Sequence, residues 1–308
     1  MFCAGVSAQA YPAKPVKVIV AYAAGNVTDV LARLVADRLT ERWNRPVVID
    51  NQPGVGGALG ARAAARAPAD GYTLLFGAAA AMTVMPHLSA DIGYDPLKDF
   101  AQIINVADTT ALLVVHPAVP AKSFNELVAF SKTLPAGVNF GSAGTGTLPH
   151  LNFEALKAHA GLRGEHVPYK SAAAPMNDLI GGRLHMMLET SSVVAANVKA
   201  GKLRALVVFA DQRNADFPDV PLAAQSIPGF ESARAWLAMF APAGVPKEII
   251  NKVHGDVVQV LAQPAVIERL KTLGLRPLGE DGATLRKRIE RDSQRLGKLV
   301  RELNIKTE

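Results

Sequence analysis

The chain has 308 residues, of which 49% are hydrophobic and 19% charged, with a formal net charge of +6. This length suits two domains, each able to bury a core, and no apolar run reaches the length of a membrane-spanning helix. Between Thr284 and Lys306 there are eight Lys or Arg and three Asp or Glu residues, so most of the positive surplus lies on one terminal segment with an apolar stripe. A solvated helix face explains that charge better than nucleic-acid binding, because no nucleic-acid motif accompanies it.

The first ten residues differ from the rest of the chain. Phe2 to Val6 is a short apolar piece, and Ala8-Gln9-Ala10 has the small–x–small pattern of a signal-peptidase site just before Tyr11. We interpret residues 1–10 as a residual signal-peptide-like segment and expect the protein to be exported to the periplasm. Cys3, the only cysteine, would leave with this segment, and a mature chain without cysteine is compatible with an oxidising compartment.

Beyond residue 10, apolar runs typical of strands alternate with segments of helical periodicity. The first unit is a strand at 16–21 followed by a helix at 28–43. Ser123, with Glu126 three residues later, has the pattern of a capping box and predicts a helix from 123 to 133. This alternation indicates an α/β fold with mainly parallel sheets covered by helices. The other predicted strands are 46–51, 72–76, 112–116, 138–140, 165–168, 185–188, 205–209 and 236–240, and the other predicted helices include 57–67, 246–261, 264–273 and 284–303.

The turn after the first strand is a candidate anion site. Small residues follow Ala21, and Gly25, Asn26 and Thr28 stand at the predicted start of the helix. A strand–turn–helix unit of this kind points unpaired backbone N–H groups and the positive end of a helix dipole into one concavity. The same unit also occurs in α/β proteins without a ligand, so the turn alone does not establish a site.

Two glycine-rich segments resemble motifs of enzymes. Gly54 to Gly60 follows a strand, as a dinucleotide-binding loop does, but its sixth position is Leu59 and no acidic residue ends the next strand. We therefore expect these glycines to allow close packing of the backbone. A nucleophile elbow centred on Ser142 would need glycine in place of Phe140. We interpret 141–147 as a second turn rich in N–H donors before a helix, with a plain structural turn as the alternative.

Isolated polar residues give weaker signals. The seven histidines lack metal-ligand spacing, so no metal site is expected. His150 falls in the first turn of a predicted helix, where capping or packing is the ordinary role. Glu189 ends a predicted strand, at the edge of the sheet where α/β proteins bind ligands, and an exposed strand-end carboxylate is the alternative.

A series of short motifs runs over nearly the whole chain from Tyr11 onward. In this order, the motifs resemble those of the periplasmic substrate-binding proteins of the tripartite tricarboxylate transporter type, also called the Bug family. The series is far more specific than any one of its members. The motifs are Tyr22–Asp29, Asn51–Gly57, Asp70–Leu75, Tyr94–Phe100, Ser142–Leu151, Val167–Lys170, Ala200–Ala205, Asp219–Pro221 and Ala241–Pro246.

The resemblance implies a two-lobed, type II-like periplasmic binding protein, each lobe a mainly parallel sheet flanked by helices, with the ligand cleft between the lobes. Such a protein is not an enzyme and needs no cofactor. It closes by hinge motion on a small carboxylate and delivers it to membrane permease subunits or a sensor domain, and we expect a monomer. In the family, two loops at helix N-termini hold the carboxylate through backbone amides and ordered waters. Carried onto this sequence, the implied ligand-binding residues are Tyr22, Ala23, Ala24, Gly25, Asn26, Thr28 and Asp29 in the first loop, Ala78 and Ala79 after Gly77, Ser142, Gly144, Gly146 and Thr147 in the second loop, and Lys170, Ser171 and Glu189, the last where the family usually has Asp.

Departures from the family pattern bear on the ligand. The first loop lacks the usual prolines and second glycine, and the loop after Phe76 reads Ala78 to Ala81 and then Met82 in place of hydroxyl and imidazole side chains. An apolar wall favours hydrocarbon bulk, since each buried CH₂ contributes about 0.8 kcal/mol. We therefore expect a carboxylate with an apolar or aromatic body rather than a tricarboxylate.

The predicted lobe 1 comprises residues 11–108 and 228–308, and lobe 2 comprises residues 109–227. The chain is expected to return to lobe 1 through the strand at 235–240. Two alternative functions remain, a ligand-sensing binding protein of a signalling system and a nucleotide-dependent oxidoreductase that uses the loop at 54–60. Titration with NADH distinguishes the oxidoreductase from a solute-binding protein, because a solute-binding protein would leave the absorbance and fluorescence of NADH unchanged.

Overall fold

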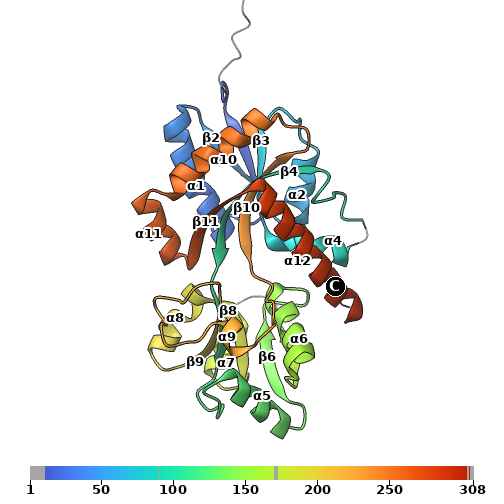
Figure 1. Cartoon of the computed structure of the whole chain (residues 1–308), viewed down its shortest axis with the longest axis vertical. Coiled ribbons are helices and arrows are strands. Elements are labelled where there is room, and N and C mark those ends of the chain that lie inside the picture. Colours follow the sequence, from blue (N-terminus) through green and yellow to red (C-terminus); the bar gives the residue numbers. More distant parts are fainter. Residues whose placement is uncertain (1–10, 90, 170–172, 304, 306–308) are drawn as a thin grey trace, which may run out of the picture.

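The computed structural model describes residues 11–89, 91–169, 173–303 and 305, arranged as two α/β lobes, each built on its own sheet (Figure 1). The six-stranded sheet of lobe 1 has the order β11-β4-β10-β3-β1-β2. Its strands are β1 (Val16–Val20), β2 (Val47–Asn51), β3 (Thr73–Ala78), β4 (Phe100–Thr109), β10 (Trp236–Pro242) and β11 (Leu275–Asp281).

Helices cover both faces of the lobe 1 sheet, because alternate residues of each strand point to opposite sides. Val18 and Val20 pack on one face against α1 (Val27–Trp43), α10 (Lys247–Leu261) and α11 (Pro264–Thr272). Ile19 packs on the other face with α2 (Ala58–Ala65), α3 (Ala79–Thr83) and α12 (Gly282–Glu302). The short helix α4 (Met85–Leu88) follows α3, and a 3₁₀ turn at Val55–Gly57 precedes α2.

Lobe 2 repeats this layered design with a five-stranded sheet of order β7-β6-β8-β5-β9. One face carries α5 (Phe124–Thr133), α6 (Leu148–Ala160) and α9 (Ala223–Ser226), and the other carries α7 (Ala173–Ile180) and α8 (Ser191–Lys199). The predicted cap of α5 is confirmed, since the Ser123 hydroxyl accepts the Glu126 amide at 3.2 Å. The strands are β5 (Ala111–Val115), β6 (Val138–Ser142), β7 (Gly164–Pro168), β8 (Met186–Thr190) and β9 (Arg204–Phe209).

The sheets are mixed, which corrects the expectation of mainly parallel ones. β10 runs antiparallel to β3 and β4, β11 runs antiparallel to β4, and β5 runs antiparallel to β8 and β9. Only β1 with β2 and β3, and β6 with β7 and β8, pair in parallel among the described strands. Every antiparallel pair involves β5, β10 or β11. β5 and β10 carry the chain into lobe 2 and back, and the sequence patterns did not predict β11 or its partner β4.

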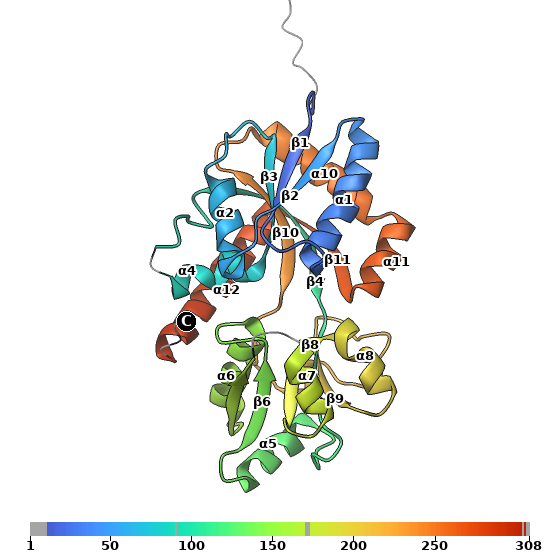
Figure 2. The same ribbon diagram turned by 180° about the vertical axis from the view of Figure 1, so that it is seen from behind.

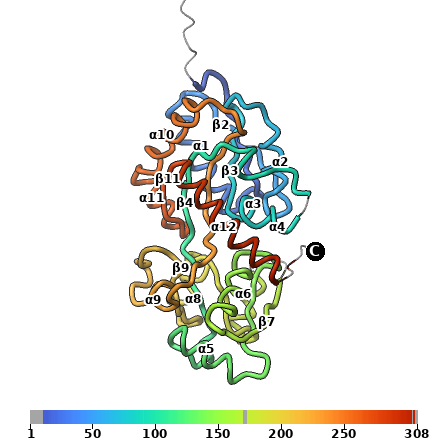
Figure 3. The backbone as a smooth tube through the Cα atoms, turned by 45° about the vertical axis from the view of Figure 1, so that its right-hand side comes forward, coloured from blue at the N-terminus to red at the C-terminus, as the bar shows by residue number. Residues whose placement is uncertain are grey.

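The lobes are joined by two crossing segments and by a helix that spans the join. Only Thr110 separates β4 of lobe 1 from β5 of lobe 2, and the chain returns to lobe 1 through β10. The two crossings pair with each other, because the Thr109 amide donates to the Ala235 carbonyl at 2.9 Å. The view from behind and the tube view show α12 running from lobe 1 down to α6 of lobe 2 (Figures 2 and 3). There Leu151 of α6 packs with Leu296 and Val300 of α12.

Candidate functional site: a cavity between the lobes

A cavity of about 360 Å³ lies where the two lobes face each other. Lobe 1 contributes Tyr22 after β1, Gly56 of the 3₁₀ turn and Ala80 of α3. Lobe 2 contributes the start of α6 and the end of β8, and residues of the crossing segments complete the lining. Most of the wall is apolar. Its lining residues are Tyr22, Gly56, Ala80, Thr109, Ala111, Thr147, Leu148, Pro149, Asn152, Leu188, Glu189, Thr190, Phe209, Ala233, Arg234 and Ala235.

The first glycine-bearing turn, between β1 and α1, is closed by its own side chains. The Asn26 carboxamide caps α1 by accepting the Thr28 amide at 2.9 Å, and the Gly25 amide donates to the Asp29 carboxylate at 2.8 Å. The Asn26 amide donates to the Ala23 carbonyl at 3.2 Å. Three of the amides that were expected to meet a ligand are therefore engaged within the turn itself.

Asp29 is the buried anchor of this turn. Besides the Gly25 amide, its carboxylate accepts from Arg33 Nε at 3.0 Å and from Asn51 Nδ2 at 2.8 Å. Burial by itself raises the pKa of Asp29, but the hydrogen bonds from Arg33, Gly25 and Asn51 outweigh burial and hold it below its usual value. Asp29 is thus a permanent anion that orders the turn, and its carboxylate faces these three donors.

The second turn, between β6 and α6, is organised around Ser142. Its hydroxyl lies 2.6 Å from His166 Nε2 and 3.0 Å from the Gly144 carbonyl oxygen, and it accepts the Gly144 amide at 3.2 Å. Thr147, the N-cap residue of α6, directs its hydroxyl to the Gly144 carbonyl at 2.8 Å rather than to an amide of the helix. The start of α6 therefore has no side-chain cap, and Thr147 and Leu148 line the cavity.

Two stacked imidazole rings support the second turn from behind. The rings of His150 and His166 lie 3.9 Å apart between centroids, and His150 Nδ1 accepts the Gly146 amide at 3.0 Å. Burial lowers the pKa of both rings, and for His166 the value falls to about 4, with the His150 ring and Lys157 adding to the effect. Both rings are therefore neutral near pH 7, and His150 must leave Nδ1 unprotonated to accept from Gly146.

Glu189 and Arg234 are the charged side chains of the described cavity wall. Burial raises the pKa of Glu189, although its own Oε1 accepts the Thr190 amide at 2.7 Å. Arg234 donates from one Nη atom to Asp108 at 3.3 Å and to Asp211 at 2.7 Å. The charge of Arg234 is therefore already compensated by two carboxylates.

The structure brings some of the predicted site residues together and leaves others beside the cavity. Tyr22, Thr147 and Glu189 line it, and Ala80, the residue after the predicted Ala78 and Ala79, lines it as well. Lys170 and Ser171 lie outside the described residues. The residues that belong to the two turns or to β3 and α3 but are not part of the lining are Ala23, Ala24, Gly25, Asn26, Thr28, Asp29, Ala78, Ala79, Ser142, Gly144 and Gly146.

The glycines of the loop at 54–60 serve packing, as the sequence predicted for them. A Cβ atom on Gly60 would lie 2.8 Å from Ala21 Cα and 2.9 Å from the Gln52 carbonyl oxygen. A Cβ atom on Gly57 would lie 3.2 Å from the Tyr22 hydroxyl. The loop is thus pressed against the end of β1, where it places Gly56 in the cavity wall.

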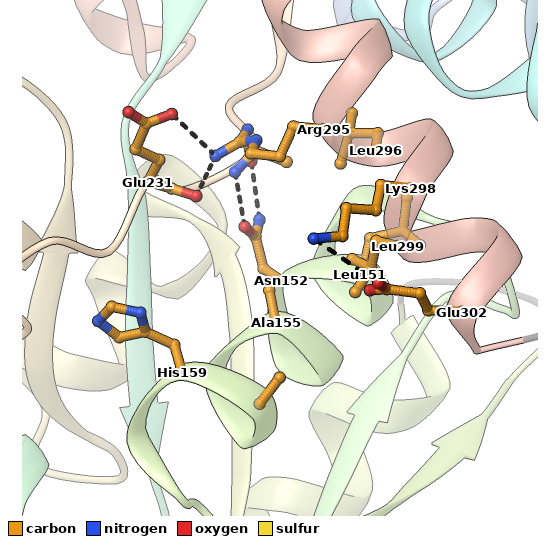
Figure 4. Close-up of a pocket in the computed structure, with 12 residues that line it drawn as sticks. Leu151, Asn152, Ala155, His159, Glu231, Arg295, Leu296, Lys298, Leu299 and Glu302 are labelled. Carbon is orange, nitrogen blue, oxygen red and sulfur yellow. Dashed lines mark hydrogen bonds and ion pairs between the residues drawn. The ribbon is translucent and has the colours of Figure 1, made fainter.

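A second pocket of about 370 Å³ lies between α6 and α12, behind a wall made by Asn152 and Ala233 (Figure 4). The Asn152 carboxamide donates to the Ala233 carbonyl and accepts the Ala233 amide, each at 2.7 Å, and both residues line both cavities. The charges of the second pocket balance, with Arg295 and Lys298 opposite Glu231 and Glu302, so it offers no net attraction to an anion.

Neither metal binding nor membrane crossing is indicated in the part of the chain that the structure describes. No group of three or more His, Cys, Asp or Glu side chains among those residues could hold a metal ion. None of the described helices combines the length and the apolar character that crossing a membrane requires.

Comparison with known proteins places this architecture in a family. Residues 31–305 match the family described as "Tripartite tricarboxylate transporter family receptor". BugT of Bordetella pertussis is 34% identical over 305 residues, which are 98% of this chain and 93% of BugT. Among solved structures, Rpa4515 of R. palustris with adipate has a TM-score of 0.80 at 30% identity, covering 96% of this chain and 99% of that one. MatC of Rhodopseudomonas palustris with bound malate has a TM-score of 0.75 at 29% identity, covering 94% and 100%.

Proposed function

Because the chain belongs to the tripartite tricarboxylate transporter receptor family, we propose that it is a periplasmic solute-binding protein that captures a small carboxylate between its two lobes. Relatives solved with adipate and with malate support a carboxylate ligand. The protein would hold the acid without changing it and release it to membrane permease subunits, with a sensor domain as the alternative recipient.

The observation that carries this proposal is the uncapped start of α6 in the wall of the interlobe cavity. The Thr147 side chain makes no cap hydrogen bond to the helix, so the Leu148 and His150 amides have no side-chain acceptor among the described residues, while Pro149 between them has no N–H to offer. Helix N-termini of this kind bind carboxylates through backbone N–H groups and the helix dipole. An acid in the cavity would meet these donors without a buried lysine or arginine of its own.

The rest of the wall favours a ligand with a hydrocarbon body. Leu148, Leu188 and Phe209 face the cavity together with Ala80 and Ala111. These side chains offer no hydrogen bonds to a second or third carboxylate, and every CH₂ that they bury contributes about 0.8 kcal/mol. The ligand class that we propose is therefore a carboxylate with an apolar or aromatic body, ahead of citrate.

Calorimetric titration and thermal shift with adipate, benzoate, malate, glutamate and citrate test the function. Benzoate, which carries one carboxylate on an apolar ring, should bind most tightly, and an acid at a hundred times its dissociation constant should stabilise the protein by about 2.7 kcal/mol. Ala80→Phe, which fills the cavity from lobe 1, should weaken binding at least tenfold. Ala155→Phe, which fills the second pocket instead, should leave binding unchanged.

Two results would refute parts of the proposal. If none of the acids binds, or if Ala155→Phe abolishes binding and Ala80→Phe does not, the interlobe cavity is not the carboxylate site. If citrate alone binds tightly, the cavity is the site but the ligand class is wrong.

A further inference from the structure

Glu189 is placed where a carboxylate ligand would meet a second carboxyl group. It lies at the end of β8 inside the interlobe cavity, where lobe 2 also contributes the start of α6 at Thr147 and Leu148. Its Oε1 accepts the amide of Thr190, which is at the same end of β8. The cavity measures only about 360 Å³, so a bound acid and Glu189 share one small space.

Two negative charges in that space would repel each other. Charges closer than the Debye length, about 8 Å at physiological ionic strength, are not screened from each other, and buried pairs are screened still less. Arg234 lines the same cavity, but it already faces Asp108 and Asp211. Tyr22, which follows β1, is neutral, and burial raises its pKa further, to about 12. The described wall therefore supplies no uncompensated cation that would allow both carboxylates to stay ionised.

We propose that Glu189 binds the ligand as a neutral carboxylic acid, so that each carboxylate enters the cavity together with one proton. The proton comes from solvent and settles on Glu189, whose O–H then donates a hydrogen bond to an oxygen of the ligand carboxylate. No covalent bond between heavy atoms forms or breaks. The inference rests on the proposed function and adds to it a proton requirement and a residue that imposes it.

The electrostatics of the unliganded cavity favour this step. Burial raises the pKa of Glu189, although the amide and hydroxyl of Thr190 act in the opposite direction. A ligand carboxylate nearby would raise it further, because a like charge disfavours ionisation. At pH values between the pKa of Glu189 in the free protein and its pKa beside the ligand, binding takes up one proton. In that range the affinity should fall about tenfold for each unit by which the pH rises.

The test is calorimetric titration of the full chain with adipate and with benzoate between pH 6.0 and 8.5, each in two buffers of different ionisation enthalpy. Wild type should take up close to one proton per acid bound and should lose affinity as the pH rises. Glu189→Gln, whose amide can donate the same hydrogen bond without a charge, should bind with no pH dependence and more tightly than wild type at pH 8.5. Glu165→Gln, which removes an exposed carboxylate of the same lobe on β7, should behave as wild type.

The outcomes separate the inference from the function on which it rests. If an acid binds but takes up no proton, or if Glu189→Gln binds more weakly than wild type at pH 8.5, the inference fails and the function stands. If neither acid binds at any pH, both fail. Lys170 lies outside the described residues and is tested separately with Lys170→Met. If Lys170→Met loses the pH dependence of binding while Glu189→Gln keeps it, the proton belongs to the lysine and the inference fails.

Discussion

Single buried polar residues, more than the glycines, determine the shape of both turns at the cavity. Asp29 collects the Gly25 amide, Arg33 and Asn51 on one carboxylate, and His150 holds the Gly146 amide through Nδ1. Each gives a buried donor its partner, which matters because an unsatisfied buried donor costs about 1–3 kcal/mol. The sequence motif identified the turns, but it could not show that their amides are partly satisfied from within, since Asn51 and His166 come from other strands.

His166 should make stability depend on pH in a defined window. Its folded pKa is about 4, against an ordinary value of 6.5, so between these two values the unfolded chain binds a proton that the folded protein does not. Stability should therefore be complete above about pH 6.5 and fall as the pH is lowered toward 4. His166→Gln removes this contribution while keeping a polar atom for Ser142. Calorimetric melting between pH 4 and 7 should show a shallower loss for the variant, and equal slopes would contradict the neutral stacked pair.

At the scale of elements, the packing of α2 against the end of β1 requires glycine at one position. A methyl group on Gly60 would lie 2.8 Å from Ala21 Cα and 2.9 Å from the Gln52 carbonyl oxygen, and backbone atoms cannot move aside cheaply. Gly60→Ala should cost about 2 kcal/mol despite the better helix propensity of alanine. Gly255→Ala is the matched control in α10, where nothing lies within 4 Å of the added methyl, and it should stabilise by about 0.5–1 kcal/mol. Urea denaturation measures both, and similar effects of the two substitutions would refute the packing argument.

The elements that sequence reasoning missed are those whose side chains break the expected period. β4 carries Gln102, Asn105 and Asp108 at intervals of three, and register shifts opposite β10 absorb the additional residues. These three polar side chains are buried and each is hydrogen-bonded within lobe 1, so β4 is a central strand although its polar residues interrupt the alternation. β11 contains Pro277 and Gly279, which an edge strand tolerates but which conceal it from pattern reading.

At the scale of the whole molecule, a ring of alternating charges ties lobe 2 to lobe 1 beside the crossing segments. Arg276 of β11 donates to Asp108 at 3.0 and 3.1 Å and to Asp211 at 3.2 Å, and Arg234 bridges the same two carboxylates. Asp211 follows β9 and is the member from lobe 2. Because Arg234 also lines the cavity, one member of this ring borders the proposed ligand site.

Asp211→Asn should loosen this connection without touching the cavity wall. Asp211 is 60% exposed at its side chain, so the pair contributes at most about 1 kcal/mol, equivalent to about a fivefold shift between lobe arrangements. Pulsed electron resonance between spin labels at Asp37→Cys and Glu165→Cys, with Cys3 replaced by Ser, should show a broader or displaced distance distribution. Asp216→Asn, which breaks the ion pair with Lys199 inside lobe 2, is the control and should leave the distribution unchanged. An identical distribution for Asp211→Asn would show that the ring does not hold the lobes.

How much of the site could be foreseen follows from where its residues lie in the chain. Tyr22, Thr147 and Glu189 stand at strand ends and helix starts, positions that a strand–turn–helix pattern marks. Arg234 and Thr109 come from the two crossing segments, which pair side by side, and Phe209 comes from the end of β9. In the sequence, Arg234 is marked only as a charged residue that stands just before a buried strand.

A crystal structure of the protein grown with the acid that binds most tightly in the titrations tests the central claim most directly. Our account predicts a single acid in the interlobe cavity, with its carboxylate at the start of α6 beside Thr147 and its body against Leu188 and Phe209. An acid seated in the pocket between α6 and α12, with the interlobe cavity filled only by water, would contradict it.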